Sequence, residues 1–355
     1  MRKLILLAAI AALLVPTAFG QPQEGKRYNM YGVMFYNLEN LFDTINNNGT
    51  YDEEFSPKGA RQWNGTKYWQ KVHNMAYAIS QMATKNTPMG PAIIGVCEIE
   101  NETVLQDLVK QPEIRDWHLQ IAPYHDSPDR RGVDVGVLYN PRYFRVLNVT
   151  NQTLEIEGEP NFRTRDQMCV TGLLAGEKVS VIVNHWPSRL GGEEASSYKR
   201  EAAGRLARRT IDSLLRDDPN QGIFFMGDLN DDPMNKSCTE ALGVHKYPKD
   251  VKTVNDLFSP FWHILEDRGI GTLGYKGSWN LFDQIIFNGY FLKYQDSKDK
   301  PRLTFVRAEV LNRDFLISKE GTREGYPHRT FSSGVFLNGY SDHFPTEIFL
   351  VKEAQ

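Results

Sequence analysis

Seven short apolar runs in the chain have the pattern expected of β-strands, and each of them stops at polar residues. Ala92–Cys97, for example, is a continuous apolar run that ends at Glu98. Runs of this length that do not alternate with polar residues suit strands buried on both faces of a sheet. The predicted strands are Met30–Asn37, Ala92–Cys97, Val133–Tyr139, Val179–Val183, Ile223–Met226, Ile285–Phe287 and Thr346–Val351.

Two longer segments between these runs have helical periodicity. Lys67–Ala83 and Glu193–Leu215 repeat apolar residues at spacings of three and four, which predicts an apolar stripe along each helix. The predicted stripes are Trp69, Val72, Ala76, Ile79 and Ala83 in the first helix, and Ala203, Leu206, Thr210 and Leu214 in the second. We expect the arginines of the second helix to form a mainly solvated face, with room for one of them to pack inward.

The order of these elements predicts an α/β architecture. Strands and helices alternate at first and strands dominate later, which favours two packed sheets with helices outside. No internal repeat or long linker divides the chain, so we expect one domain over residues 27–352. Residues 43–66 and about 289–335 are predicted to be irregular insertions, of the kind that often shapes access to a site.

The first twenty residues have the features of a secretory signal peptide. Arg2 and Lys3 precede an apolar run, Leu4–Val15, and the small residues Ala18 and Gly20 then predict cleavage near Gly20, before Gln21. The alternative is a membrane anchor, but a run of this length is shorter than the ~20 residues needed to cross a bilayer. We therefore expect an exported protein, periplasmic or extracellular, without stable membrane insertion.

Charge and cysteine content narrow the picture further. The formal net charge is −3 for the full chain and becomes −5 when Arg2 and Lys3 are removed with residues 1–20. Nucleic-acid-binding domains usually carry a basic excess, so this balance argues against tight nonspecific binding of duplexes and leaves room for a local basic groove. Three widely spaced cysteines cannot all pair and have no metal-binding spacing; we expect buried thiols. The sequence does not indicate an oligomeric state.

Charged and amide side chains recur where the predicted strands end. A single such residue is more often a turn former or a cap than a catalytic group, so the argument depends on the whole set. Hydrolysis of a phosphate ester needs a hard cation with oxygen ligands, a group that activates water and a group that stabilises the leaving oxygen. The set offers oxygens and two imidazoles for these tasks: Asn37, Glu39, Glu98, Asp228, Asn230, Asp342, His185 and His343.

Six motifs around these residues resemble the endonuclease/exonuclease/phosphatase superfamily, which is also called DNase I-like, and in particular its secreted bacterial branch. They occur in the superfamily's order and span about residue 30 to the C-terminus; Gly-Asp-Leu-Asn and Ser-Asp-His are the most specific. The resemblance implies a four-layered α/β sandwich with the site at one edge of both sheets. The motifs are Phe35–Asn40, Ile93–Glu98, Asn184–Ser188, Gly227–Pro233, Asp283–Ile286 and Ser341–His343.

The resemblance also implies a metal site. Glu98 would be the principal ligand, and Asn37 and Asp342 would lie nearby, with Asn37 close to the substrate as well. Glu39 is a further candidate ligand, although it could equally cap the following segment. Carboxylate and amide oxygens suit Mg²⁺ best among the common ions, with Mn²⁺ or Ca²⁺ as alternatives.

Catalytic roles follow from the same resemblance. Asp228 and Asn230 would position the attacking water and the phosphate. His343 would contact the scissile phosphate or act as the base, and Asp283 would set its tautomer. His185 would protonate the leaving group or contact the transition state.

Two arginines are candidate substrate-binding residues. Arg131 lies in a segment, Arg130–Gly136, that resembles the one before the central strand in secreted bacterial nucleases, and a guanidinium suits phosphate. Either Arg131 or Asp134 would then lie near the site; the alternative is an ordinary turn followed by a strand. Arg189, shortly after His185, is a similar candidate.

The sequence therefore predicts an exported, divalent-metal-dependent phosphoesterase. We expect a phosphodiesterase or endonuclease acting on DNA or RNA. The alternatives are a phosphatase or a sphingomyelinase-like phospholipid phosphodiesterase on the same scaffold, because a fold does not set the substrate. A noncatalytic phosphoester-binding module would be expected to lack a ligand or a histidine, and none is missing here. The absence of a Gly-x-Ser-x-Gly motif argues against a serine hydrolase.

Overall fold

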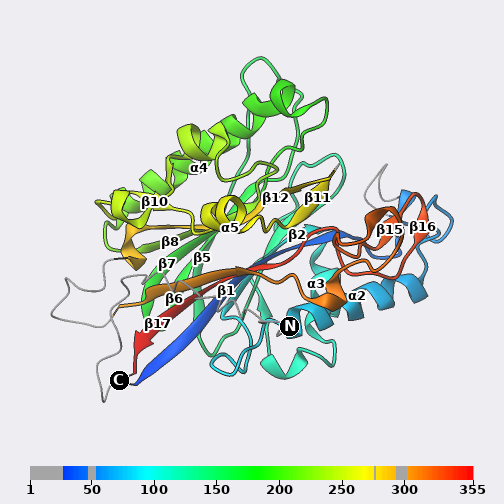
Figure 1. Ribbon diagram of the computed structural model, residues 1–355, viewed down its shortest axis with the longest axis horizontal. Coiled ribbons are helices and arrows are strands. Elements are labelled where there is room, and N and C mark those ends of the chain that lie inside the picture. Colours follow the sequence, from blue (N-terminus) through cyan, green and yellow to red (C-terminus); the bar gives the residue numbers. More distant parts are fainter. Residues whose placement is uncertain (1–26, 47–52, 276, 293–301, 355) are drawn as a thin grey trace, which may run out of the picture.

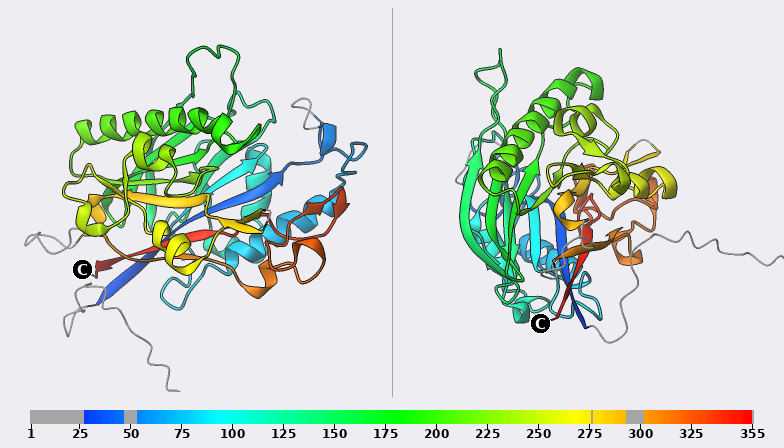
Figure 2. Two further views of the ribbon diagram at one scale, coloured as in Figure 1. Left: turned by 45° about the horizontal axis from the view of Figure 1, so that its top comes forward. Right: turned by 90° about the vertical axis from the view of Figure 1, so that its left-hand side faces the viewer.

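The computed structural model describes residues 27–46, 53–275, 277–292 and 302–354, and these form a four-layered α/β sandwich (Figures 1 and 2). The predicted signal peptide, residues 1–20, lies outside the described residues. Two mixed sheets pack face to face, with helices on their outer faces. The α/β sandwich predicted from the sequence is confirmed.

The first sheet has six strands in the order β14-β17-β1-β2-β4-β3. Its centre is the parallel pair β1–β2, and the other neighbours are antiparallel. The strands are β1 (Tyr28–Leu41), β2 (Ile93–Ile99), β3 (Gln120–Ile121), β4 (Asp134–Tyr139), β14 (Thr304–Val310) and β17 (Thr346–Glu353).

The second sheet has seven strands in the order β5-β6-β7-β8-β13-β10-β9. It too contains a central parallel pair, β7–β8, flanked by antiparallel neighbours. The strands are β5 (Phe144–Gln152), β6 (Gln167–Leu174), β7 (Glu177–His185), β8 (Gly222–Asp228), β9 (Val244–His245), β10 (Leu257–Phe258) and β13 (Asp283–Asn288). Two small hairpins stand apart from both sheets: β11 (Leu273–Tyr275) with β12 (Ser278–Asn280), and β15 (Phe331–Ser332) with β16 (Val335–Phe336).

An α-helix connects the strands of each central parallel pair, because parallel neighbours need a crossover. Helix α2 (Gly65–Ser80) lies between β1 and β2 in the chain and covers the outer face of the first sheet with α3 (Glu102–Val109). Helix α4 (Glu193–Asp217) lies between β7 and β8 and covers the second sheet. A shorter helix, α5, spans Phe261–Arg268.

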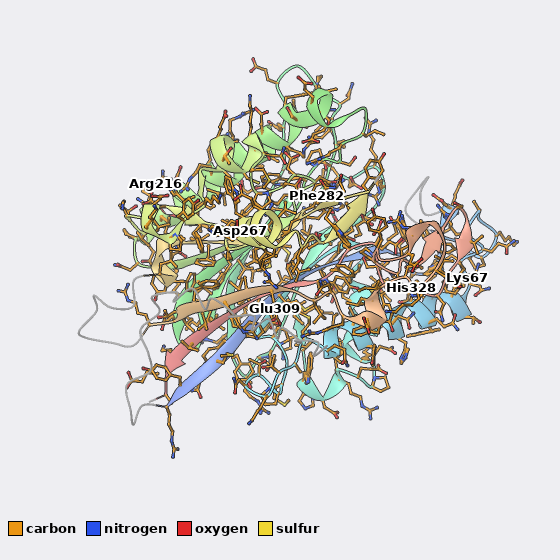
Figure 3. The ribbon with its side chains drawn as sticks, in the orientation of Figure 1. Lys67, Arg216, Asp267, Phe282, Glu309 and His328 are labelled. Carbon is orange, nitrogen blue, oxygen red and sulfur yellow. The ribbon has the colours of Figure 1, made fainter. Side chains whose placement is uncertain are left out.

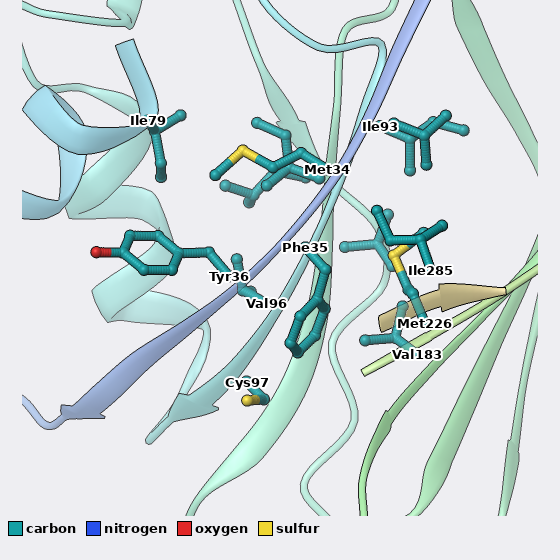
Figure 4. Packing of buried hydrophobic residues seen from close by; sticks show 14 of the residues in the cluster. Met34, Phe35, Tyr36, Ile79, Ile93, Val96, Cys97, Val183, Met226 and Ile285 are labelled. Carbon is teal, nitrogen blue, oxygen red and sulfur yellow. The ribbon is translucent and has the colours of Figure 1, made fainter. Parts of the chain in front are cut away.

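Side chains of β1 alternate between two cores (Figure 4). Phe35 points toward Met226 and Ile285 of the second sheet, whereas Met34 and Tyr36 point toward Ile79 of α2. Both faces of the central strands are therefore buried, which is why these strands read as unbroken apolar runs. A separate cluster, which includes Ile182, Phe225, Ala207 and Ile211, packs the second sheet against α4.

All seven predicted strands and both long helices are present, but the helical stripes need correction. In α2, Trp69 is 50% exposed, while the buried face includes Lys71. In α4 the buried face contains Ala203, Ala207, Ile211 and Leu215 together with Arg200. Burial of Arg200 agrees with the expectation that one arginine of this helix could pack inward, and its Nε lies 2.8 Å from Asp231 Oδ1. Burial of Lys71 was not expected, because the predicted stripe contained apolar residues alone.

The predicted irregular insertion at about 289–335 contains a regular strand. β14 pairs with β17 at the edge of the first sheet, with a register shift between Phe305 and Arg307. Only Phe305 and Val310 of its seven residues are buried, so it has no continuous apolar run by which the sequence could reveal it. The predicted buried thiols are confirmed: Cys97, Cys169 and Cys238 are all buried and unpaired.

Across the part of the chain that the structure describes, no helix has the length and apolarity required to cross a membrane.

Candidate active site

The polar strand ends meet at one edge of both sheets. Parallel strands β7 and β8 end there side by side, so that His185 is the register partner of Asp228. Antiparallel β13 begins where β8 ends, which places Asp283 opposite Asp228. In the first sheet, β1 and β2 end at the same edge at which β17 begins, just after Asp342. Residues far apart in the chain therefore converge because each sheet joins a parallel pair to an antiparallel neighbour.

Local backbone irregularities shape this edge. The β1–β2 register shifts between Asn37 and Leu41, and the β2–β4 register shifts between Cys97 and Ile99. Glu39 (φ 46°), Glu98 (φ 58°) and Asn230 (φ 49°) have left-handed backbone conformations. Such conformations are costly for residues other than glycine, and they cluster at functional sites because the surrounding structure must hold them in place. Glu39 and Glu98 lie within the two register shifts, where a bulge changes the direction of a strand.

His343 and Asp283 form a buried pair. His343 Nδ1 lies 2.7 Å from Asp283 Oδ2, and Nε2 lies 3.8 Å from Asp228 Oδ2. Burial favours the neutral ring, but the negative charges of Asp283 and Asp228 outweigh it and raise the pKa of His343 well above its usual value. The ring therefore donates Nδ1–H to Asp283, which leaves Nε2 directed at the centre of the site.

Asp228 is the centre of the polar network. Its carboxylate accepts hydrogen bonds from Asn37 Nδ2 and from the backbone N–H of Asn230, both at 3.0 Å. Burial raises the pKa of Asp228 to about 6, although the positive charge of His343 opposes the shift. A carboxylate of this kind holds a proton more readily than an exposed one, as a general base requires.

His185 is also buried, with Nε2 placed between two carboxylates. The distances are 3.7 Å to Asp228 Oδ2 and 3.8 Å to Glu98 Oε1. Burial and the charge of Arg165 lower the pKa of His185 well below its usual value. Its Nδ1 has no hydrogen-bond partner among the described residues. The neutral ring donates a hydrogen bond from one nitrogen and accepts one at the other, but it lacks the additional proton of an imidazolium that a strong general acid would transfer.

Glu98 and Asp342 are the carboxylates with most access to solvent at this edge, and each is matched with an arginine. Arg131 Nη2 lies 3.4 Å from Glu98 Oε2, and Arg329 Nη2 lies 2.9 Å from Asp342 Oδ2. Burial opposes ionisation of Glu98, but the positive groups around it, of which Arg131 has the largest effect, together outweigh burial and the pKa falls to about 2. The pKa of Asp342 is lowered in the same way, because the charges of Arg329, His343 and Lys71 together outweigh burial. Both groups are ionised at neutral pH.

The remaining predicted ligands have protein partners. Asn37 Oδ1 accepts from the Glu39 backbone N–H at 2.8 Å, and its Nδ2 donates to Asp228. The Glu39 carboxylate accepts from Arg329 and from the Thr330 backbone N–H. Asn37 and Glu39 thus lie at the site, and their side-chain polar atoms already form hydrogen bonds with other protein groups.

The donor set fits a divalent cation. Ligand atoms of Asp228, Asp283 and His343 lie within 4.8 Å of one another, so this buried group could hold one. Two of its members already form the His343–Asp283 hydrogen bond, however, whereas Glu98 and Asp342 are more accessible and are purely oxygen ligands. Hard cations favour such oxygen ligands.

The predicted arginines differ in their surroundings. Arg131 also donates to Asn40 Oδ1 at 2.6 Å and stands beside Glu98, at the site. Arg189 donates to the Asn230 carbonyl at 2.8 Å and packs over the ring of Phe282, at 4.6 Å from its centroid. It also forms ion pairs with Glu193, Asp231 and Asp232, so its guanidinium braces the loop after β8.

Asp134 is more buried than Arg131, and its carboxylate forms hydrogen bonds with residues of the loop before β4. It accepts hydrogen bonds from the Tyr124 and Ser127 hydroxyl groups. Burial raises the pKa of Asp134 to about 6. Of the two residues that the sequence offered in this segment, Arg131 is therefore the one that contacts a candidate metal ligand.

Three charged residues near the site were missed from the sequence. Arg329 lies in a segment predicted to be irregular, Lys71 in a helix judged only by its apolar stripe, and Arg165 in a stretch with no pattern. Arg165 donates to the carbonyl groups of His185 and Trp186 and pairs with Asp129. No local signal marks these residues, because each acts through partners distant in the chain. Figure 3 labels His328 and Phe282, which immediately precede Arg329 and Asp283.

Comparisons with known proteins agree with this geometry. A sequence model of the Endonuclease/Exonuclease/phosphatase family matches residues 32–352. No curated protein is detectably similar to the chain in sequence.

Solved structures with the same fold include two from Bacteroides thetaiotaomicron. An endonuclease/exonuclease/phosphatase family protein has a TM-score of 0.55 and 14% identity, covering 93% of this chain and all of its own. A mannosyl-6-phosphatase has a TM-score of 0.53 and 17% identity, covering 90% of this chain and 99% of its own. A humanized TDP2 from D. rerio has a TM-score of 0.50 and 11% identity, covering 90% and 98%. At these identities the likeness shows the fold.

Proposed function

The chain belongs to the endonuclease/exonuclease/phosphatase family and is a phosphoric ester hydrolase, and from this premise we propose that it is an exported, divalent-metal-dependent phosphodiesterase that cleaves nucleic acid. The observation that carries the proposal is the buried His343–Asp283 pair, at 2.7 Å, directed at Asp228 on an edge that also holds Glu98 and Asp342. This arrangement joins an oriented imidazole, a buried carboxylate and two ionised carboxylates in one place.

Glu98 and Asp342, with Asn37 beside them, are the residues that we expect to hold the cation. When bound there, a divalent ion supplies positive charge for the oxygens of the phosphate. Mg²⁺ is the expected ion, with Mn²⁺ or Ca²⁺ as alternatives.

The side chains of the site activate the water and bind the phosphate. Asp228 orients the attacking water and accepts its proton, since its carboxylate faces the centre of the site. Asn37 and the Asn230 backbone N–H hold that carboxylate in position. His343 is protonated on both nitrogens, because the charges of Asp283 and Asp228 stabilise the imidazolium, and it donates a hydrogen bond from Nε2 to the phosphate while Nδ1–H is held by Asp283. His185, neutral and buried, donates from Nε2 to a second phosphate oxygen.

A phosphatase is the second candidate. Two guanidinium groups, of Arg131 and Arg329, flank the candidate metal ligands, and a terminal phosphate carries more negative charge than a diester. The mannosyl-6-phosphatase with the same fold shows that a phosphatase can be built on it. TDP2 has been solved with a single-stranded DNA product, which supports the phosphodiester candidate in the same way.

Export is proposed from the sequence alone. The basic start and the apolar run of residues 1–20 support it, and the expected mature N-terminus is Gln21. Expression of the full chain in a bacterium, followed by mass spectrometry of the protein outside the cytoplasm, checks this. Recovery of the uncut chain from the cytoplasm alone would exclude it.

The substrate is tested with purified protein from residue 21 onward, with Mg²⁺, Mn²⁺ or Ca²⁺ and with EDTA. The substrates are single-stranded and duplex DNA, RNA, sphingomyelin, sugar phosphates and a chromogenic phosphodiester; Glu98→Gln serves as the blank. We expect metal-dependent cleavage of DNA or RNA that the variant lacks. Activity on sugar phosphates alone would establish the phosphatase instead, and equal activity in EDTA would refute metal dependence.

A further inference from the structure

Arg329 bridges two carboxylates at the edge of the site. Its Nε and Nη2 lie 3.0 Å from Glu39 Oε1, and Nη2 also lies 2.9 Å from Asp342 Oδ2. The side chain is 29% exposed, and Nη1 forms no hydrogen bond with a described residue. The guanidinium is thus fixed along one side and open on the other.

The guanidinium of Arg329 lies close to the reaction centre. While Asp342 Oδ2 contacts Arg329, its other oxygen, Oδ1, lies 4.0 Å from His343 Nε2. Only one carboxylate therefore separates Arg329 from the imidazole that faces the phosphate. A planar guanidinium at this position matches the geometry of phosphate oxygens.

Glu39 is the anchor of Arg329. Besides the bonds to Arg329, the carboxylate accepts from the Thr330 backbone N–H at 2.7 Å and lies 4.0 Å from Lys71 Nζ. The side chain is 5% exposed. A cation at Glu39 would have to displace these donors, so the carboxylate is better suited to hold the arginine than to bind a metal.

The segment around Arg329 is also supported by hydrogen bonds from α2 and by aromatic packing. Lys71, fully buried in α2, donates to Thr330 Oγ1 at 2.7 Å and to the Tyr340 carbonyl. The next residue, Phe331, packs against the rings of Trp63 and Phe336. A side chain supported in this way keeps its orientation without a ligand, as recognition of a phosphate requires.

We propose that Arg329 binds a phosphate oxygen of the substrate and that Glu39 orients Arg329 instead of binding the metal. The proposal deepens the phosphoesterase function above and rests on it for the identity of the ligand. It assigns to Glu39 a role different from the one that the family resemblance implied.

The test compares the wild type with Arg329→Gln, Arg329→Lys and Glu39→Gln. Arg313→Gln is the matched control, since Arg313 is an exposed arginine in the same connection between β14 and β17. Calorimetry gives the affinity for inorganic phosphate in the presence of Mn²⁺, electron paramagnetic resonance gives the affinity for Mn²⁺ alone, and urea unfolding confirms that each variant folds.

For Arg329→Gln we expect phosphate affinity to fall about tenfold or more, which corresponds to about 1.4 kcal/mol, while Mn²⁺ affinity changes by less than about threefold. Arg329→Lys should be intermediate, and Arg313→Gln should match the wild type. Glu39→Gln should keep Mn²⁺ binding and lose part of the phosphate affinity, because Arg329 is no longer oriented.

Wild-type phosphate affinity in Arg329→Gln, or a wild type that binds no phosphate, would overturn the assignment of Arg329. Loss of Mn²⁺ binding in Glu39→Gln would make Glu39 a ligand and overturn the second part. The experiment distinguishes failure of the proposed phosphoesterase function from failure of the proposed role of Arg329. A wild type that cleaves no ester, yet binds phosphate through Arg329, would refute the hydrolase and not the arginine.

Discussion

At the residue scale, two carboxyl groups without exposed surface, Asp283 and Glu347, show how partners decide what a buried charge does. Asp283 lies 2.7 Å from a positively charged histidine, so its own charge is compensated. Neither oxygen of Glu347 has a hydrogen-bond partner among the described residues. A buried charge without a partner is costly, so ionisation of Glu347 would destabilise the protein. The charge of Asp283 is compensated by His343, so Asp283 can stay ionised at the candidate site.

Asp283→Asn should lower kcat by roughly a hundredfold or more, because an amide can hold the wrong tautomer of His343. The affinity for Mn²⁺ should change little. The matched control is Asp267→Asn, since Asp267 Oδ2 lies 2.7 Å from His263 Nδ1 in an exposed pair on α5. Steady-state kinetics of both variants check this; equal loss in the control, or collapse of Mn²⁺ affinity in Asp283→Asn, would contradict the assigned role.

Glu347→Gln should stabilise the protein, by about 1 kcal/mol, and more at high pH than at low pH. Burial and the nearby charge of Glu309 raise the pKa of Glu347 well above its usual value, with Arg307 opposing. A raised carboxyl pKa means that the folded state binds the proton more tightly than the unfolded state. The destabilisation that Glu347 causes is therefore smallest in acid, and it grows as the pH rises from the ordinary carboxyl pKa toward the folded-state value.

Urea unfolding at pH 5 and pH 8 measures this difference directly. The gap between Glu347→Gln and the wild type should widen from pH 5 to pH 8. A gap that is constant, or that narrows with rising pH, would show that Glu347 is ionised in the folded protein.

At the element scale, the position of the site depends on how closely β7 and β8 approach. Gly227 is the register partner of Asn184, and a Cβ added to it would lie 2.3 Å from the Asn184 carbonyl oxygen. Backbone cannot yield as a flexible side chain can, so the strands would have to separate. Asp228 and His185 follow immediately on these two strands, and the site would be distorted with them.

Gly227→Ala should therefore destabilise the protein by about 1–3 kcal/mol, the usual cost of overpacking, and reduce kcat. Gly65→Ala, at the start of α2, is the control: nothing lies within 4 Å of the added Cβ, and alanine favours a helix. Urea midpoints and initial rates of the two variants are compared. Wild-type stability and rate in Gly227→Ala would show that the strand pair has more room than this packing implies.

At the scale of the whole molecule, the two sheets share one core and one site. Phe35 of the first sheet packs toward Met226 and Ile285 of the second. Of the candidate cation ligands, Glu98 belongs to β2 of the first sheet and Asp342 precedes β17 of that sheet, while Asp228 and Asp283 belong to the second sheet. A cation bound at this shared edge connects residues that folding must bring together. Its binding should therefore stabilise the complete fold.

Addition of Mg²⁺ or Mn²⁺ to metal-free protein should raise the melting temperature, with a stabilisation of about 2.7 kcal/mol when the ion is at a hundred times its Kd. EDTA should reverse the shift, and Glu98→Gln should abolish it. Scanning calorimetry of the two proteins with and without the ion measures it. A shift of equal size in Glu98→Gln would place the ion elsewhere.

The sequence by itself determined the central strands and the two long helices, and it pointed to most of the residues that the structure brings together at the candidate site. Strands buried on both faces leave unbroken apolar runs, and the motifs Gly227–Asn230 and Ser341–His343 stand directly at strand ends. The tertiary structure alone decided what depends on distant partners. Lys71 and Arg200 are buried because Glu39 and Asp231 pair with them, and Arg329 reaches Asp342 only because Glu39, far away in the chain, holds it. A charge carries no local sign of the partner that will bury it, so such residues become visible only when the chain is folded.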